Sequence, residues 1–256
     1  MTLDFTYDRY DRLLEEVAAT GVPFLTVREY LAGEPLPEGF VVLRHDVDRK
    51  PGNALDFARI EADRGVASTY YFRAAGGFDR GTIEAVESMG HEVGYHYEDL
   101  DTADGDHEAA RASFAENLEE LRSMAAVDTA CMHGNPLTPY DNRDLWGDDV
   151  SPESYGLAGE AYLSVDFGDL HYYSDTGRTW RSGDLKVKDH PVGEAVEPEQ
   201  VDTTVELTEL VVANPERRYY VLSHPDRWAD DPGEWAVEAA FDTAKNAAKR
   251  LLVLAR

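Results

Sequence analysis

Short apolar segments alternate with amphipathic segments of helical period along this chain, and that alternation limits the fold more than any other feature. Strands are expected at residues 40–43, 68–72, 91–95, 127–132 and 218–222. Helices are expected at residues 7–19, 53–64, 81–88, 107–124 and 235–252. Strands joined through helices pair in parallel by crossover connections. About seven such units predict an α/β fold, a distorted and incomplete (β/α) barrel of about seven parallel strands.

No repeat, low-complexity tract or Gly/Ser-rich linker divides the sequence, so we expect a single catalytic domain over residues 1–256. The segment from about residue 148 to residue 199 is rich in Gly, Asp and Tyr and lacks regular periodicity. We expect this segment to form long loops over one face of the barrel.

The net charge of −27 disfavours nucleic acids and anionic membranes as partners, because both are polyanions. The acidic residues are spread along the whole chain, and lysine occurs only five times. Such a composition predicts a halophilic protein with an acidic surface, in which salt screens the repulsion between charges. A polycationic partner is the alternative explanation.

No segment has the roughly 20 apolar residues of a membrane span, and the acidic N-terminal segment does not resemble a signal peptide. The single cysteine, Cys131, excludes an internal disulfide and is compatible with a reducing compartment. These features predict a cytoplasmic protein; the oligomeric state is left open.

The sharpest motif, LRHDVDR, begins at the end of the first expected strand. Residues i and i+2 of a strand point to the same side, so Asp46 and Asp48 project together and His45 projects to the other side. In parallel α/β folds, ligands bind at the carboxyl ends of the strands. Two neighbouring carboxylates repel each other unless a cation or a shared proton intervenes. The alternative is that both aspartates shape the loop before Pro51.

Three further expected strand ends carry a histidine. The sequence GHEVGYHYEDL places His96 at one strand end and Glu98 two residues later. The sequences CMHGNP and YVLSHP place His133 and His224 at two other strand ends. Neutral imidazole and carboxylate oxygen are suitable ligands for zinc or a similar ion. These clusters predict a divalent metal site at the ends of the strands.

In their order and context, these four segments resemble those of the polysaccharide deacetylases of carbohydrate esterase family four, also called the chitooligosaccharide-deacetylase homology domain. The chain resembles a divergent branch of that family. The resemblance covers about residues 41–222 and implies a barrel of the glycoside hydrolase/deacetylase type. It also implies that Asp46 is the general base, that Asp48 and His96 bind the metal, and that His224 is the catalytic acid.

Two positions depart from the family pattern. The second motif normally has another metal-binding histidine four residues after the first, where this chain has Leu100. Glu98 is expected to replace that ligand, with His133 as the alternative. His133 stands near the usual place of an arginine that orients the base. Together with Asn135 and Trp180 it is expected to contact the substrate.

The resemblance implies a metal-dependent hydrolase that acts on carbon–nitrogen bonds other than peptide bonds. It would remove an N-acetyl group from an amino sugar or polysaccharide precursor, with zinc or a similar divalent metal as cofactor. The expected partner is thus a carbohydrate or another small-molecule substrate. Two alternatives remain. One is an amidohydrolase acting on a small cyclic amide. The other is a non-catalytic carbohydrate-binding protein with a degenerate site, which Leu100 would favour.

Overall fold

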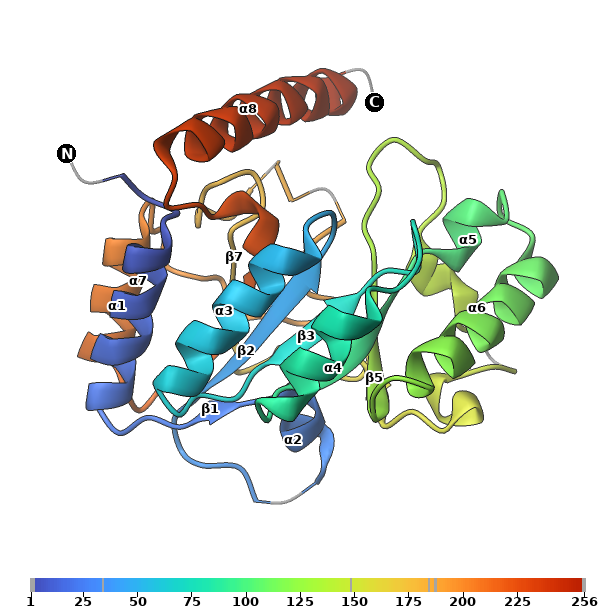
Figure 1. Ribbon diagram of the computed structural model, residues 1–256, viewed down its shortest axis with the longest axis horizontal. Coiled ribbons are helices and arrows are strands. Elements are labelled where there is room, and N and C mark those ends of the chain that lie inside the picture. Colours follow the sequence, from blue (N-terminus) through green and yellow to red (C-terminus); the bar gives the residue numbers. More distant parts are fainter. Residues whose placement is uncertain (1–2, 34, 148, 184, 187, 255–256) are drawn as a thin grey trace.

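The core of the protein is a single sheet of parallel strands, seen in a computed structural model that describes residues 3–33, 35–147, 149–183, 185–186 and 188–254 (Figure 1). The strands run in the spatial order β6-β5-β4-β3-β2-β8-β7, and the short β1 pairs with the beginning of β2. Their bounds are β1 (Phe24–Leu25), β2 (Phe40–Val47), β3 (Thr69–Phe72), β4 (Glu92–Tyr97), β5 (Val127–Met132), β6 (Gly159–Glu160), β7 (His171–Ser174) and β8 (Arg218–Ser223).

The sheet curls into an incomplete barrel, as the sequence predicts. Its edge strands β6 and β7 do not pair with each other within the described part of the chain. Side chains bridge the gap instead: the hydroxyl of Tyr162, just after β6, lies 3.2 Å from the hydroxyl of Tyr172 in β7. Tyr220 of β8 donates a hydrogen bond to the backbone oxygen of Ala161 across the interior. The barrel is therefore closed by side chains at a place where backbone pairing stops.

Helices cover the outer face of the sheet and one end of the barrel (Figure 1). The α-helices are α1 (Tyr7–Ala19), α2 (Val27–Leu31), α3 (Pro51–Asp63), α4 (Arg80–Ser88), α5 (Asp99–Thr102), α6 (His107–Arg122), α7 (Thr204–Ala213) and α8 (Pro232–Leu254). The 3₁₀ turns are η1 (Asn142–Leu145), η2 (Pro152–Tyr155) and η3 (Pro225–Arg227). Among the described residues, no helix combines the length and apolar character that a membrane span needs.

Strand β2 is the central positioning element, and all eight of its residues are buried. It pairs with β8 on one side and with β1 and β3 on the other, so its backbone groups are satisfied along both edges. Its alternation sends Arg44 and Asp46 into the barrel, whereas His45 packs among Tyr10, Phe57 and Tyr70 on the helix side. The next helix, α3, begins at once with a proline, which suits the first turn of a helix.

The expectation of long loops over residues 148–199 is wrong in part, because β6 and β7 lie within this segment. These strands have two and four residues, too few to establish an alternating pattern. The helix α7 was also not predicted. Its outer face carries the exposed apolar residues Val205 and Val212, which weaken the amphipathic period.

Candidate functional site

A cavity of about 300 Å³ opens at the carboxyl ends of the strands, where the predicted site residues were expected. The ends of β2, β4, β5 and β8 contribute to its wall, and one face of α8 lines it from above. Six of the predicted site residues line this cavity: Asp46, Asp48, His96, His133, Asn135 and His224. Residues from four separate strand ends are thus brought together in one place.

Asp48, His96 and His133 form a compact group whose potential ligand atoms all lie within 4.8 Å of one another. Oδ1 of Asp48 lies 3.5 Å from Nε2 of His96 and 3.6 Å from Nε2 of His133. This oxygen is buried and has no hydrogen-bond partner among the described residues. Burial acts to raise the pKa of Asp48, but the surrounding histidines hold it well below its usual range. The carboxylate is therefore ionised and its inward oxygen lacks a partner.

The tautomer of His96 follows from its other nitrogen, which lies 3.0 Å from the backbone oxygen of Cys131. A carbonyl oxygen only accepts hydrogen bonds, so Nδ1 carries a proton and Nε2 is the ring nitrogen that points toward Asp48. This nitrogen and Oδ1 of Asp48 face each other in a buried place, and the oxygen has no hydrogen-bond partner among the described residues. Such an arrangement fits a divalent cation, because the cation would satisfy both atoms at once.

Glu98 lies behind His133 and outside the compact group of ligand atoms. Its Oε2 is 3.1 Å from Nδ1 of His133, and Arg73 donates to both of its oxygens over 2.6 and 3.2 Å. Burial acts to raise the pKa of Glu98, but His133 and Arg73 lower it to about 2. The structure thus places Glu98 in ion-pair distance of the imidazole, although Nδ1 of His133 has no hydrogen-bond partner among the described residues, and it places His133 where it can reach a metal. Of the two replacement ligands left open by the sequence, the geometry fits His133.

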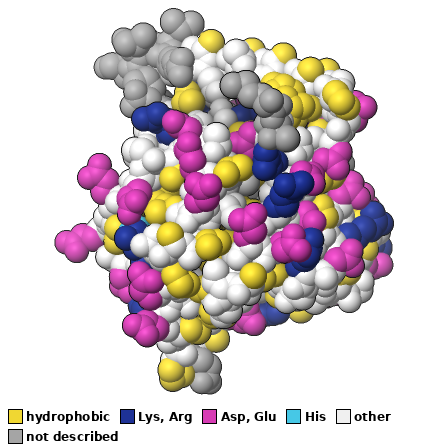
Figure 2. Space-filling view, turned by 90° about the vertical axis from the view of Figure 1, so that its left-hand side faces the viewer, with side chains coloured by type: hydrophobic (Ala, Val, Ile, Leu, Met, Phe, Trp, Pro, Cys, Tyr) yellow, Lys and Arg dark blue, Asp and Glu magenta, His cyan; other side chains and the backbone are white. Residues whose placement is uncertain are grey.

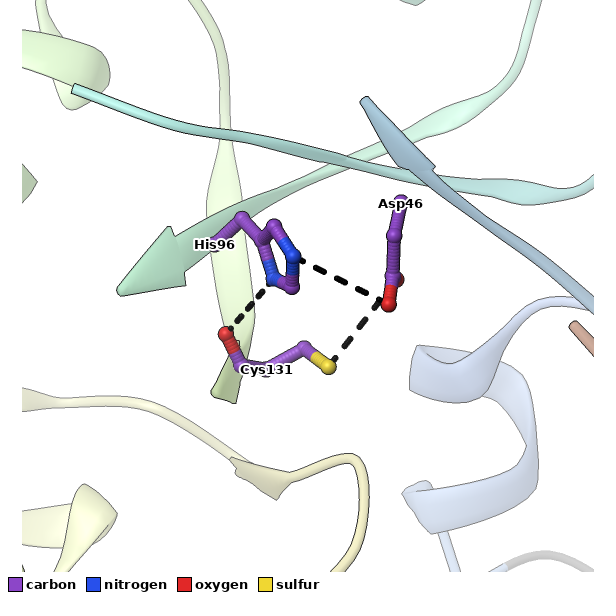
Figure 3. A group of neighbouring side chains, drawn as sticks. All are labelled: Asp46, His96 and Cys131. Atoms are coloured by element: carbon purple, nitrogen blue, oxygen red, sulfur yellow. Dashed lines mark hydrogen bonds and ion pairs between the residues drawn. The ribbon is translucent and has the colours of Figure 1, made fainter. Parts of the chain in front are cut away.

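Asp46, His96 and Cys131 form a second group that shares His96 with the first (Figure 3). Oδ2 of Asp46 lies 3.8 Å from Nε2 of His96, and Oδ1 lies 4.0 Å from the cysteine sulfur. Burial raises the pKa of the Cys131 thiol well above its usual range, which keeps the sulfur protonated. A neutral thiol is a poor metal ligand. The group of Asp48, His96 and His133 is therefore the better candidate metal site.

Arg44, which is not among the predicted site residues, lies beside Asp46. Its side chain is fully buried, with Nη2 3.5 Å from Oδ2 of Asp46. The guanidinium lies 4.3 Å from the centre of the Tyr162 ring and donates to Cys131. Arg44 precedes Asp46 by two residues on β2, so the same alternation that paired the aspartates places it on their side. A guanidinium thus accompanies the carboxylate even though the arginine usual for the family is missing.

His224 is held by a buried aspartate at the end of β7. Its Nδ1 lies 2.6 Å from Oδ1 of Asp175, and its backbone N–H donates to the other oxygen over 2.9 Å. Trp228 donates to that same oxygen over 2.8 Å. Burial and the charge of Arg227 act to lower the pKa of His224, but Asp175, with a smaller contribution from Asp48, raises it above its usual value. Asp175 was not predicted, although the sequence YYSD carries it to a strand end like the others.

Trp180 does not lie in the cavity, contrary to its expected contact with the substrate. Only 2% of the residue is exposed, and its ring packs with Phe5 and Trp228. Its indole nitrogen donates to Oγ1 of Thr204. An aromatic side chain in an irregular segment can stack on a sugar ring, which is why Trp180 was expected to contact the substrate. Here the loop folds inward and the tryptophan packs in the core.

Ser223, His45 and Glu61 form a chain of contacts that resembles a hydrolytic triad. Oγ of Ser223 lies 2.7 Å from Nδ1 of His45, whose Nε2 lies 2.6 Å from Oε1 of Glu61. None of the three is more than 1% exposed, and none lines the cavity. A substrate cannot reach them, so this group holds β2, β8 and α3 together.

No family model and no curated protein matches the sequence. Similar solved structures include a family 4 carbohydrate esterase from Streptomyces lividans in complex with acetate, at 13% identity and a TM-score of 0.40; the match covers 84% of this chain and 91% of that chain. A family 4 carbohydrate esterase from Bacillus anthracis matches at 12% identity and a TM-score of 0.39, over 93% of this chain and 86% of that chain. A peptidoglycan deacetylase from Bacillus subtilis matches at 10% identity and a TM-score of 0.35, over 83% and 96% of the chains.

Two of these three solved structures are family 4 carbohydrate esterases, and the third is a peptidoglycan deacetylase. The identities and TM-scores are low, so the function has to be inferred from the side chains of this chain.

Proposed function

We propose that this protein is a metal-dependent hydrolase that removes an N-acetyl group from an amino sugar or a polysaccharide precursor. The observation that carries the proposal is the buried oxygen of Asp48, which faces two imidazole nitrogens and has no hydrogen-bond partner among the described residues. Burying an ionised oxygen without a partner is costly, and a cation between these atoms removes that cost.

Asp48, His96 and His133 would hold the ion, with Glu98 fixing the ring of His133 from behind. One oxygen and two imidazole nitrogens suit zinc, and three protein ligands are typical of catalytic zinc sites that keep one position open. A bound zinc ion polarises a carbonyl and lowers the pKa of bound water, which is the chemistry that hydrolysis of an acetamide requires.

The residues around this group supply the proton transfers. Asp46 accepts the proton of the attacking water as general base, and the buried Arg44 beside it fixes the direction of the carboxylate. His224 donates a proton to the departing amine. Asp175 supports this role, because its negative charge favours the protonated imidazole. An amine leaves poorly unless it is protonated, so the acid matters as much as the base.

The proposal is tested by measuring zinc content and acetate release together in two variants. Asp48→Asn is expected to lose the zinc and the activity, because the neutral amide replaces the charged ligand. Asp46→Asn is the matched control on the same strand and is expected to retain zinc while losing at least about a hundredfold in turnover. The substrates are N-acetylated amino sugars and their short oligomers.

Equal zinc content in Asp48→Asn and the wild type would contradict the metal assignment. Release of ammonia or ring opening of a cyclic amide without acetate release from any sugar would contradict the deacetylase assignment. Saturable sugar binding by a zinc-loaded protein that hydrolyses none of these compounds would contradict an enzymatic function.

A further inference from the structure

The cavity reverses the charge balance of the chain. The whole sequence has 24 Lys and Arg residues against 51 Asp and Glu residues. Among the described residues that line the cavity, the basic ones are Arg49, Arg73, Lys188, Arg227, Lys245 and Lys249, and the acidic ones are Asp46, Asp48, Asp189 and Asp242. Three of the five lysines of the sequence are in this set. Positive charge is thus concentrated at the candidate site of an otherwise acidic protein.

Some of these basic residues have carboxylate partners that account for them. Arg73 is bound by Glu98, and Arg49 is bound by Asp226 and Glu238. These two side chains are therefore neutralised locally and contribute little net positive charge to the cavity.

Three others have no such partner: within the described chain, no carboxylate lies within 4.0 Å of the cationic nitrogens of Arg227, Lys245 or Lys249. Arg227 donates to the backbone oxygen of Asp175 over 3.1 Å, and Lys249 donates to that of Leu185 over 3.0 Å. The ammonium of Lys245 lies 4.5 Å from the centre of the Phe241 ring. The direct partners of these cations are thus neutral, although Asp175, Asp242 and Asp226 act on Arg227 over longer distances and raise its pKa.

The three cations also disfavour one another. Burial and the charge of Arg227 lower the pKa of Lys249 to about 8, and burial with Arg227 and Arg49 lowers that of Lys245. Three carboxylates act in the opposite direction without cancelling these effects: Asp242 on both lysines, Asp48 on Lys245 and Asp189 on Lys249. Binding of an anion among these cations is favourable, because it reduces their mutual repulsion.

We propose that Arg227 of η3 and Lys245 and Lys249 of α8 form an anion subsite that takes the phosphate group of a phosphorylated N-acetyl amino sugar. This inference rests on the proposed function, since it names the substrate class of the same cavity. Three positive charges without a contacting carboxylate suit a phosphate dianion better than the single charge of a carboxylate. Helix α8 lies over one end of the barrel (Figure 1). Its two lysines line the same cavity as Asp46 and Asp48, so one sugar phosphate can reach both sets of residues.

The inference is tested by calorimetric binding, which needs no turnover. The ligands are N-acetylglucosamine 1-phosphate, N-acetylglucosamine, and the corresponding N-acetylated hexosaminuronic acid as the carboxylate-bearing comparison. We expect the phosphate ester to bind at least about tenfold more tightly than either of the others. The double variant Lys245→Gln/Lys249→Gln is expected to remove this preference and leave the affinity for the neutral sugar unchanged. Lys50→Gln is the matched control, because Lys50 pairs with Glu234 and Glu238 of α8 outside the cavity.

Equal affinity for the phosphate ester and the neutral sugar would overturn the inference, and so would equal affinity for the carboxylate sugar or an equal loss in Lys50→Gln. The outcome is separable from that of the proposed function. Lysine-dependent binding of the phosphate ester without any acetate release would support the subsite and contradict the deacetylase. Acetate release from neutral and phosphorylated sugars at the same kcat/KM, with equal binding, would support the deacetylase and contradict the subsite.

Discussion

At the scale of single residues, three aspartates of the cavity region differ mainly in what stands beside them. Asp46 faces the guanidinium of Arg44, Asp48 faces two imidazoles, and Asp175 accepts hydrogen bonds from His224 and Trp228. A guanidinium is planar and stays charged at every accessible pH, so it can fix the direction of a neighbouring carboxylate. An imidazole with an unprotonated nitrogen leaves room for a metal. The neighbouring side chains therefore account for the different proposed roles: Asp46 as general base, Asp48 as metal ligand and Asp175 as the group that orients His224.

Glu98→Gln separates a ligand from a residue that orients a ligand. Because Glu98 contacts His133 and lies outside the compact ligand group, we expect the variant to bind zinc about 10- to 100-fold more weakly and not to lose the metal. The measurement is competition against a chromogenic chelator, with Asp48→Asn as the reference for a lost ligand. If Glu98→Gln retains no more zinc than Asp48→Asn, Glu98 is itself a ligand.

Asp175→Asn is expected to shift the pH dependence of the reaction. Asp175 raises the pKa of His224, so its removal lowers that pKa. A general acid is active while protonated, so the alkaline limb of the kcat/KM profile should move to lower pH in the variant. The pH profile of acetate release checks this. An alkaline limb at the same pH in both proteins would show that His224 is not the acid.

The sequence predicts part of this site because alternation in a strand is a reliable geometric rule. It places Asp46 and Asp48 together and His45 on the other side. It does not decide between Glu98 and His133, because both follow a strand end and the path of the loop determines which reaches the ion. Asp175 follows a strand of four residues that the pattern does not reveal.

At the scale of elements, the packing of α3 against the sheet depends on one buried carboxylate. Glu61 accepts hydrogen bonds from Ser68 and Tyr70 over 2.6 Å each, contacts His45 at 2.6 Å and is also bound by Tyr10. These residues belong to α1, β2, β3 and the segment just before β3. Such a network specifies one arrangement of the elements, and it is costly when a member is lost.

Glu61→Gln is expected to lower the free energy of unfolding by about 3 kcal/mol at neutral pH, measured by urea denaturation. Burial acts to raise the pKa of Glu61, but His45, His91 and Ser68 lower it from the ordinary 4.5 to about 2. A carboxylate with a lowered pKa stabilises the fold above the ordinary value, and this contribution is lost as pH falls toward 2. The difference between wild type and variant should therefore shrink in that range.

The exposed Glu84→Gln is the control for Glu61→Gln and should change stability very little, because Glu84 makes only a surface pair with Arg80. A pH-independent difference between the wild type and Glu61→Gln would contradict an ionised Glu61.

The elements that were predicted share long, regular patterns, and those that were missed do not. Strand β2 and helix α1 follow from a continuous apolar run and a clear helical period. Helix α8 was expected as a closing helix, but periodicity does not say that one of its faces lines the cavity. That placement depends on η3, the turn between β8 and α8. Its Pro225 directly follows His224 and stops the strand, so the chain changes direction before α8 begins.

At the scale of the whole molecule, the acidic composition has to be reconciled with a basic cavity. Acidic side chains are spread over the face shown in Figure 2 and do not gather in one patch. Their mutual repulsion opposes the compact state, and salt screens it over about 3 Å at molar concentration. The cavity charges lie close together and partly buried, so salt screens them less.

The melting temperature is therefore expected to rise when potassium chloride is raised from about 0.1 M to about 2 M. Calorimetric melting curves across this range provide the measurement, with sucrose at matched osmolality to separate screening from osmolyte effects. A melting temperature that is independent of salt, or that rises equally in sucrose, would contradict a halophilic adaptation.

The position of β2 also limits how this protein can change in length over evolution. Its side chains alternate between the helix side, where His45 joins the network of Glu61, and the barrel interior, where Arg44 and Asp46 lie. An insertion or deletion of one residue within β2 would exchange the two faces, turning His45 toward the cavity and Asp46 toward the helices. Length variation is therefore expected in the segments on either side of β2, whereas the strand itself should tolerate substitutions far better than insertions or deletions.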